Sequence, residues 1–344
     1  MRVVEEKTHG KLSVLNWSTL SDERAAGVRP EKEIRRAALI LTGACDFACP
    51  YCKTLGGGRA PTIKRERALE LLETFAAAGL RELRISGGEP VLVPWLPELI
   101  RRAVELGVRV AVSSNGYSEP KVYEGLIDAG VAEFSISLDS AEPEEADRLS
   151  GGRKNVLARV KRSIEAIASR GIPVYVGMTC GTGRSAEAMR SAVELAERLG
   201  VAEIKIMSLA QEGDAVDVSW VDEELAERFP LLRWRAGNYR DGRDVRGLRE
   251  GDSGRCSIVL DDLTVAGDRH YPCNVYFREG GEPIGNAGDD VAAILSDRAA
   301  WSLGRDSRKD PICRANCMDI LRAYNDRAAE LADERAKNDE KTRP

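Results

Sequence analysis

The residues of this chain best suited to chemistry are its cysteines, which gather in short segments. Five of the eight cysteines lie in the runs CDFACPYC (45–52) and CRANC (313–317). The chain has only two histidines, so mixed cysteine–histidine zinc sites and histidine-based catalytic triads are poorly supplied. The N-terminal segment shows no secretory signal. We therefore expect reduced thiols that serve metal or redox chemistry.

The first run places Cys45, Cys49 and Cys52 three and then two residues apart. Cysteine thiolates are the usual ligands of iron–sulfur cubes, and this close spacing allows one loop to supply three corners of a cube. A cube held by three cysteines keeps one iron open for another ligand. The alternative is a structural zinc site whose fourth ligand lies elsewhere in the chain.

The predicted secondary structure places this run at the end of a strand. Short runs rich in Val and Ile predict strands at 38–43, 83–86, 108–114, 132–139, 173–179 and 202–208. Helical spacing of apolar residues predicts helices at 62–79, 96–107, 120–130, 154–171 and 185–200. This alternation predicts an α/β fold with parallel strands, a partial (β/α)6 TIM-like barrel followed by a small Cys-rich α+β extension. A doubly wound open sheet is the structural alternative.

The CxxxCxxC pattern directly after the first strand resembles the cluster loop of the radical S-adenosylmethionine (SAM) superfamily. The resemblance covers roughly residues 36–210. It implies a [4Fe–4S] cluster on Cys45, Cys49 and Cys52 that binds SAM and cleaves it reductively into methionine and a 5′-deoxyadenosyl radical. That radical would abstract a hydrogen atom from a substrate. The resemblance also implies a reductant such as flavodoxin or ferredoxin.

Polar residues at later strand ends extend the resemblance. Ser86, Gly87, Gly88 and Glu89 match the family motif that contacts the amino group of SAM. The glycines permit close backbone approach, and Glu89 offers an acceptor for an ammonium group. The remaining candidate SAM ligands are Tyr51 near the adenine, Ser113, Ser114 and Asn115 near the ribose, and Ser137 and Asp139 after the fourth strand. Loop capping or packing is the alternative role of each.

A second group, Cys256, Cys273, Cys313 and Cys317, supplies a full ligand set for another [4Fe–4S] cube. The segment between the first two predicts a hairpin turned at Gly267. Helices are expected at 290–303 and 314–338, and the CRANC pair is expected near a helix start. The group is similar to the SPASM and twitch extensions of the superfamily. A full SPASM domain has seven cysteines, so one auxiliary cluster of the twitch type is expected. A zinc knuckle is the alternative.

Cys180 belongs to neither group and follows the fifth strand, so we expect it to face the barrel mouth. It is either a small buried apolar residue or a hydrogen-atom donor, as in some radical epimerases of the superfamily. Lys205, Glu212, Arg148 and Arg153 are candidates for holding polar groups of a substrate. Surface or structural charge is their alternative role.

Composition narrows the function further. The net charge of −5 and the absence of a basic field argue against nucleic acid as a partner. No apolar stretch approaches the length of a membrane span, and a cytoplasmic location is expected. The expected domains are an N-terminal extension (1–37), the barrel (38–210), a loop-like linker (211–255) and the auxiliary-cluster domain (256–338).

Three functional readings follow. The first is a radical SAM enzyme that oxidises or epimerises a small molecule, such as a natural-product or cofactor precursor. The second is a radical SAM enzyme that modifies a ribosomal peptide. The third is a non-catalytic zinc or iron–sulfur binding module. Peptide-modifying members often carry a winged-helix domain for the leader peptide, and the 37 residues before the first strand are too few for one.

Overall fold

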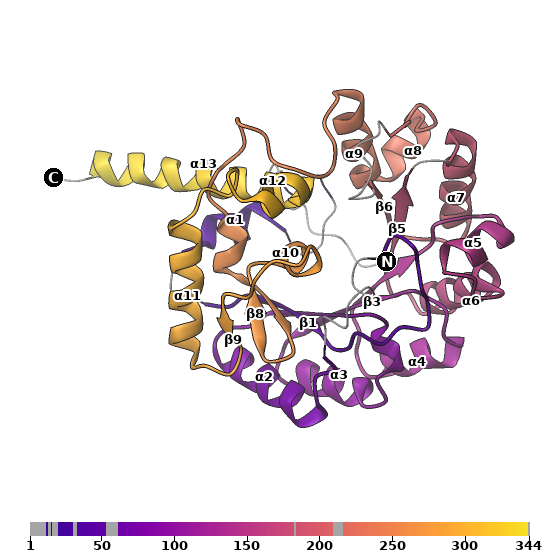
Figure 1. Cartoon of the computed structure of the whole chain (residues 1–344), viewed down its shortest axis with the longest axis horizontal. Coiled ribbons are helices and arrows are strands. Elements are labelled where there is room, and N and C mark those ends of the chain that lie inside the picture. The colour runs from indigo at the N-terminus through magenta and orange to yellow at the C-terminus, as the bar shows by residue number, and fades with distance from the viewer. Residues whose placement is uncertain are drawn as a thin grey trace.

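The computed structural model describes residues 12, 15, 20–29, 33–52, 61–181, 184–208 and 216–342. Within them one curved sheet has the strand order β6-β5-β4-β3-β2-β1-β7-β8-β9 (Figure 1). Its parallel part contains β1 (Arg36–Ile40), β2 (Glu82–Ser86), β3 (Arg109–Ser114), β4 (Glu133–Ser137), β5 (Val174–Cys180) and β6 (Glu203–Ser208). The six strands confirm the predicted ones to within a few residues.

The helices between these strands cover the outer face of the sheet (Figure 1). They are α2 (Arg65–Ala77), α3 (Leu96–Glu105), α4 (Pro120–Asp128), α5 (Pro143–Leu149), α6 (Val156–Ser169) and α7 (Ala186–Arg198). A doubly wound sheet would carry helices on both faces, so the partial-barrel prediction is confirmed. Short α5 was not predicted. The inner face of the sheet remains available for a site.

The pattern of α3 explains how such a helix forms and stops. Its residues Leu96, Leu99, Ile100 and Ala103 share one face and are buried against the sheet. Pro97 lies in the first turn, where its missing N–H has no helical partner to lose. The helix ends before Gly107, which adopts a φ of +74° that suits glycine.

The C-terminal segment extends the same sheet. Strand β7 (Asp262–Ala266) pairs in parallel with β1, and β8 (Arg269–Tyr271) and β9 (Gly285–Asn286) follow in antiparallel pairing. The predicted hairpin turn at Gly267 is confirmed by its φ of +59°. The sequence of a short apolar strand does not show which edge of a sheet it joins. The position of β7 beside β1 was therefore not predictable from the βα pattern.

The segment 211–255, expected to be loop, contains helices in its described part. These are α8 (Glu223–Arg228) and α9 (Pro230–Arg240), which packs against β6. The charged composition of the segment concealed them, although Leu225, Phe229, Leu232 and Ala236 belong to the hydrophobic core.

The C-terminal helices largely follow the prediction. They are α10 (Asn274–Arg278), α11 (Val291–Leu303), α12 (Pro311–Asn316) and α13 (Asp319–Thr342), with short 3-10 helices η2 (Pro90–Leu92) and η3 (Ser257–Leu260) elsewhere. The helix expected over 314–338 is divided at Cys317 into α12 and α13. None of the helices in the described part is long and apolar enough to cross a membrane.

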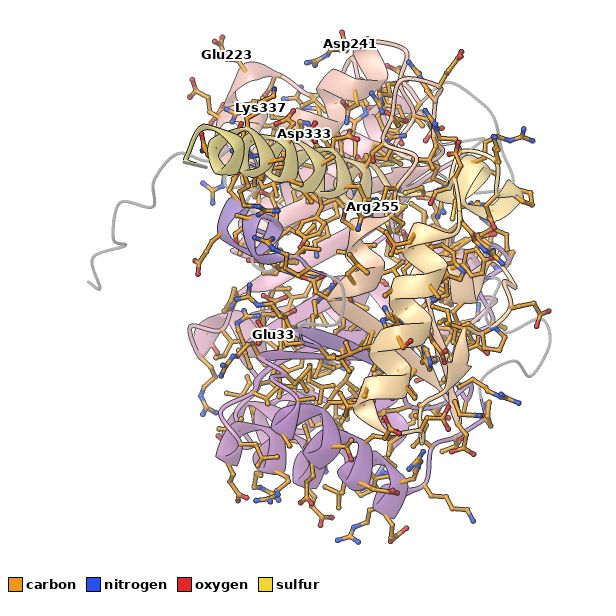
Figure 2. The ribbon with its side chains drawn as sticks, turned by 90° about the vertical axis from the view of Figure 1, so that its left-hand side faces the viewer. Glu33, Glu223, Asp241, Arg255, Asp333 and Lys337 are labelled. Carbon is orange, nitrogen blue, oxygen red and sulfur yellow. The ribbon has the colours of Figure 1, made fainter. Side chains whose placement is uncertain are left out.

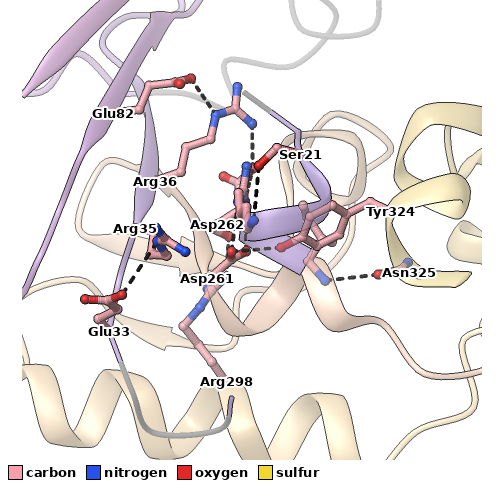
Figure 3. A network of polar contacts seen from close by, with 12 residues as sticks. Ser21, Glu33, Arg35, Arg36, Glu82, Asp261, Asp262, Arg298, Tyr324 and Asn325 are labelled. Atoms are coloured by element: carbon pink, nitrogen blue, oxygen red, sulfur yellow. Dashed lines mark hydrogen bonds and ion pairs between the residues drawn. The ribbon is translucent and has the colours of Figure 1, made fainter. Parts of the chain in front are cut away.

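The N-terminal helix α1 (Asp22–Gly27) packs against α13 (Figure 2), whose outer face carries exposed Asp333 and Lys337. Arg24 of α1 donates two hydrogen bonds of 2.8 Å to Asp261, and Tyr324 of α13 donates to the same carboxylate (Figure 3). These contacts bind α1 to the C-terminal part of the chain.

Candidate active site

A cavity of about 500 Å³ lies on the inner face of the sheet, where the parallel strands end. It gathers most of the residues that the sequence singled out, although they come from five separate segments. Within residues 38–210, the predicted site residues in its lining are Cys45, Cys49, Tyr51, Cys52, Ser86, Gly87, Gly88, Ser113, Ser114, Asn115, Ser137, Asp139 and Lys205. Glu89 and Cys180, predicted in the same range, do not line it.

The Cys loop, residues 42–52, is held by its own backbone and by Thr42. The Thr42 hydroxyl accepts a 3.0 Å hydrogen bond from the Ala44 N–H. The N–H of Phe47 donates to the sulfur of Cys45 at 3.4 Å, and the N–H of Cys52 donates to the carbonyl of Cys49 at 3.0 Å. The three cysteines are half-buried, and none forms a disulfide. Burial raises the pKa of the Cys49 thiol to about 12, so a bound cation is needed to hold it as thiolate.

Gly87 and Gly88 allow the end of β2 to lie directly against the Cys loop. A Cβ on Gly87, whose φ is +155°, would lie 2.5 Å from the carbonyl oxygen of Thr42. A Cβ on Gly88 would lie 2.3 Å from the carbonyl oxygen of Ala44. The sequence predicts a close backbone approach at these glycines. In the structure they admit the backbone of the loop that carries the cysteines.

Glu89 stabilises this junction from behind the cavity. One carboxylate oxygen accepts from the Asn115 N–H at 2.6 Å and the other from the Val91 N–H at 3.2 Å. The side chain is completely buried, and burial raises its pKa to about 7. Glu89 does not line the cavity, and its role as an acceptor for an ammonium group stays a prediction, because each oxygen that receives one N–H can accept a further hydrogen bond.

Asn115, Tyr51 and Asp139 connect the Cys loop to two strand ends. The Asn115 amide donates to Asp46 at 2.7 Å, and the Tyr51 hydroxyl donates to Asp139 at 2.8 Å. The second oxygen of Asp139 accepts from the N–H and the hydroxyl of Thr179, at 2.7 and 2.8 Å. Residues predicted separately as SAM ligands are thus direct partners of one another.

The segment after α5 also braces the Cys loop. The Ala48 N–H donates to the Ser150 carbonyl at 2.8 Å, and a Cβ on Gly151 would lie 2.3 Å from the Ala48 carbonyl oxygen. Gly151 has a φ of +83°. The glycine pair after Ser150 was the available signal for this contact. The neighbouring candidates Arg148 and Arg153 are exposed and lie outside the cavity lining.

Cys180 does not face the barrel mouth. Side chains alternate along β5: Gly177 and Thr179 line the cavity, whereas Met178 and Cys180 belong to the hydrophobic core between sheet and helices. Cys180 is 3% exposed, and burial raises its pKa to about 12. The buried apolar alternative describes its surroundings.

Comparison with known proteins identifies the domain that surrounds this cavity. Residues 39–196 match the family model of the radical SAM superfamily. The chain carries a radical SAM domain. Radical SAM proteins use a [4Fe–4S] cluster and SAM. The match covers β1 to α7 and includes the Cys loop.

Sequence relatives have distinct activities. The AdoMet-dependent heme synthase of Methanosarcina barkeri is 28% identical over 203 residues, which are 58% of this chain and 57% of that protein. The chain thus aligns with little more than half of the heme synthase. The GTP 3',8-cyclase of Pseudomonas putida is 28% identical over 242 residues, 66% of this chain and 72% of the cyclase.

Solved structures share the fold over a longer part of the chain. Streptococcus suis SuiB superposes with a TM-score of 0.57 at 13% identity, covering 77% of this chain and 66% of SuiB. The structure titled native anSMEcpe with bound AdoMet and Kp18Cys peptide has a TM-score of 0.56 at 12% identity, covering 88% of this chain and 98% of the other. At these identities the likeness concerns the fold.

The second cysteine group adjoins the radical SAM domain. Cys256, Cys273, Cys313 and Cys317 together line a small cavity of about 20 Å³. Burial raises the pKa of Cys256 to about 12 and that of Cys273 to about 11. Among the described residues no three of His, Cys, Asp and Glu are placed as ligands of one metal ion, and the four thiols surround the small cavity instead. Cys273 lines both cavities.

Charged residues of the cavity were largely missed from sequence. Arg278, on α10, donates to the hydroxyl of Ser86 at 3.2 Å and to the side chain of Asn274 at 3.1 Å. It thereby joins the C-terminal segment to the end of β2. No local pattern marks such a contact, because it spans 192 residues of chain. Of the two further substrate-holding candidates, Lys205 lines the cavity and Glu212 lies outside the described residues.

Proposed function

We propose that this radical SAM enzyme holds a [4Fe–4S] cluster on Cys45, Cys49 and Cys52 and abstracts a hydrogen atom from a small molecule bound in the cavity of about 500 Å³. One observation carries the proposal. The three cysteines of the Cys loop line the same cavity as the polar strand ends that resemble SAM ligands, and that cavity is large enough for small ligands.

The donor set suits the proposed groups. Seven free thiols stand as three on the Cys loop and four around the small cavity, and iron–sulfur cubes are held by such cysteine sets. When bound, the cluster and SAM supply a 5′-deoxyadenosyl radical. The side chains of the cavity hold the ligands in position. Hydroxyls of Ser113 and Ser137 offer hydrogen bonds to polar ligand edges, while Leu149 and Leu157 keep water from the reacting atoms.

Oxidation of the substrate is favoured over epimerisation. Epimerisation needs a hydrogen-atom donor on the far side of the substrate, and Cys180 is turned into the core. Cys273 lines both cavities, which supports an auxiliary cluster held by the second cysteine group and adjacent to the substrate. Such a cluster is suited to accepting an electron. The described residues 256–342 would then serve as a twitch-like auxiliary domain.

A small-molecule substrate is supported by the sequence relatives, because they are named a GTP 3',8-cyclase and an AdoMet-dependent heme synthase. A ribosomal peptide is the second candidate. SuiB has been solved with its precursor peptide SuiA, with a TM-score of 0.57 at 12% identity, and anSMEcpe with a peptide. Anaerobic purification followed by mass spectrometry of co-purified ligands separates these candidates: a retained peptide would favour the second.

The test of the proposal is an anaerobic reconstitution with paired variants. Wild type should bind about eight irons and form deoxyadenosine when reductant and SAM are added. Replacing Cys45, Cys49 and Cys52 by Ala should leave about four irons and no deoxyadenosine. Replacing the second group by Ala should also leave about four irons but retain deoxyadenosine formation. Zinc in place of iron, with no cleavage of SAM, would overturn the proposal.

A further inference from the structure

Two buried arginines lie beside the second cysteine group and outside the linings of both cavities. Arg298 belongs to α11 and is 1% exposed, and Arg322 belongs to α13 and is 4% exposed. Within the described chain, every hydrogen bond that either guanidinium donates ends on a backbone carbonyl oxygen. Neither makes an ion pair with a carboxylate among these residues. A guanidinium that is held only by neutral carbonyl groups retains its net charge.

Arg298 holds the backbone in front of Cys273. Its guanidinium donates to the carbonyl oxygens of the two preceding residues of the chain, at 3.0 and 3.4 Å. Ser302 lies four residues after Arg298 and therefore on the same face of α11, and its hydroxyl donates to the carbonyl of Cys256 at 2.9 Å. One face of α11 thus braces two of the four cysteines.

The two carboxylates that act on Arg298 are already bound by other arginines. They are those of Asp261 and Asp262 (Figure 3). Arg24 donates to both oxygens of Asp261 at 2.8 Å, and Arg36 donates to Asp262 at 2.6 Å. Arg298 reaches Asp262 through the backbone carbonyl of that residue. The attraction of both carboxylates does not offset burial, which lowers the pKa of Arg298 to about 10.

Arg322 has a similar environment at Cys317. Its guanidinium donates to the carbonyl oxygens of Asp244 and Arg246 at 3.0 and 3.4 Å, and also to that of Gly247. The N–H of Gly247 in turn donates to the carbonyl of Cys317 at 2.9 Å. Arg322 therefore holds the turn that binds the backbone of a third cysteine.

The carboxylates that act on Arg322 are also engaged elsewhere. They are those of Asp319 and Asp252. Asp319 accepts two hydrogen bonds from Arg235, at 3.0 and 2.9 Å, and Asp252 accepts one from Arg243. Burial, followed by the charge of Arg243, lowers the pKa of Arg322 in spite of both carboxylates.

The thiols beside these arginines are costly to ionise without a bound cation. Burial raises the pKa of Cys256 to about 12, that of Cys273 to about 11 and that of Cys317 well above its ordinary value. The charge of Arg298 acts in the opposite direction on the first two, and the charge of Arg322 does so on the third. Positive charges on α11 and α13 therefore favour the thiolates and any anionic centre that they hold.

We propose that Arg298 and Arg322 are positioning residues of the second cysteine group, where they stabilise an anionic metal centre and raise its reduction potential. Reduction of a [4Fe–4S] cluster adds one electron and thus negative charge. A nearby positive charge stabilises the reduced form more than the oxidised form. That a cluster occupies this group rests on the proposed function. A substrate radical that gives one electron to this cluster and one proton to solvent becomes the oxidised product.

A redox titration of the second cluster tests the proposal. The full chain with Cys45, Cys49 and Cys52 replaced by Ala is reconstituted without oxygen, so that electron paramagnetic resonance reports the second cluster alone. Arg298→Gln and Arg322→Gln are made in this parent chain. In each variant the reduced fraction at a fixed potential should fall at least tenfold, a shift of about 59 mV to lower potential for one electron. An unchanged potential in both variants would overturn the inference.

Further variants separate charge from packing. Arg298→Lys retains the charge but not the planar fork, so its potential should stay close to that of the parent chain. Equal shifts in Arg298→Lys and Arg298→Gln would contradict the role of charge. Arg240→Gln is the matched control, because Arg240 of α9 also donates to two carbonyls, those of Val218 and Val221, outside both linings. It should leave the potential unchanged. Arg298→Met, which fills the same space without charge, takes the place of an Arg298→Gln chain that does not fold.

Metal retention tests the same charges whichever metal the group binds. Iron and zinc released to a chromogenic chelator are measured for the parent chain and for Arg298→Gln. The variant should hold its metal at least about tenfold more weakly, and Arg298→Lys should restore part of the loss. Zinc with weaker retention in the variant would contradict the cluster of the proposed function but support the anionic centre. Equal retention would contradict it. Deoxyadenosine formation by wild type checks SAM cleavage separately, so the two proposals can fail independently.

Discussion

The hydroxyl of Tyr51 donates a 2.8 Å hydrogen bond to the carboxylate of Asp139, which joins the Cys loop to the end of β4. Burial, followed by the Asp139 charge, raises the pKa of Tyr51 well above its ordinary value, so the hydroxyl remains a donor. Asp139 in turn accepts two hydrogen bonds from Thr179 of β5. One carboxylate therefore couples the loop that carries the cysteines to two strands of the barrel.

Tyr51→Phe should loosen the Cys loop. Loss of a hydrogen bond to a charged group costs about 1.5–3 kcal/mol of unfolding free energy. We expect a lower Tm together with slower deoxyadenosine formation, while iron binding persists. Tyr324→Phe is the matched control, because Tyr324 also donates to a carboxylate, that of Asp261 at 2.9 Å, but lies outside the cavity lining. It should lose stability and retain SAM cleavage. Equal rates in the two variants would contradict a role of Tyr51 at the site.

Glu89 should make stability depend on pH. Its pKa is about 7 in the folded chain against an ordinary value of 4.5, mainly because burial disfavours the carboxylate. The folded state therefore binds the proton more tightly than the unfolded state. The associated stability is present below pH 4.5 and is lost as the pH rises through about 7. Relative to Glu89→Gln, wild type should lose Tm over this interval. A difference in Tm that is constant with pH would contradict the assignment.

Local patterns explain what the sequence predicted. The CxxxCxxC spacing, the glycine pair and the apolar strands are each contained within a few residues, and they gave the barrel and the Cys loop. Contacts between segments far apart in the chain could not be predicted from the sequence. Arg278 reaches Ser86 across 192 residues, and β7 joins β1 although more than two hundred residues separate them. The orientation of Cys180 could have been predicted from the sequence, because side chains alternate along a strand and Cys180 therefore lies on the same face of β5 as Val176 and Met178.

Gly88→Ala should displace the Cys loop. Its Cβ would lie 2.3 Å from the Ala44 carbonyl oxygen, a backbone atom that moves only with the loop. Overpacking of this kind costs about 1–3 kcal/mol. We expect a lower Tm, weaker retention of iron on the first cysteine group and reduced deoxyadenosine formation. Gly125→Ala in α4 is the control, because a Cβ there has no neighbour within 4 Å and alanine favours helix. Normal iron content in Gly88→Ala would contradict this account.

Cys180→Ala should leave the radical chemistry intact. The thiol is buried among apolar side chains on the face of β5 opposite the cavity, so its removal leaves a small void and costs a modest amount of stability. Deoxyadenosine formation should match wild type, and electron paramagnetic resonance should show no accumulated substrate radical. Thr179→Val, one residue earlier, removes a hydrogen bond to Asp139 on the cavity side and should slow the same reaction. Accumulation of a substrate radical in Cys180→Ala would restore the thiol as hydrogen-atom donor and require β5 to turn during catalysis.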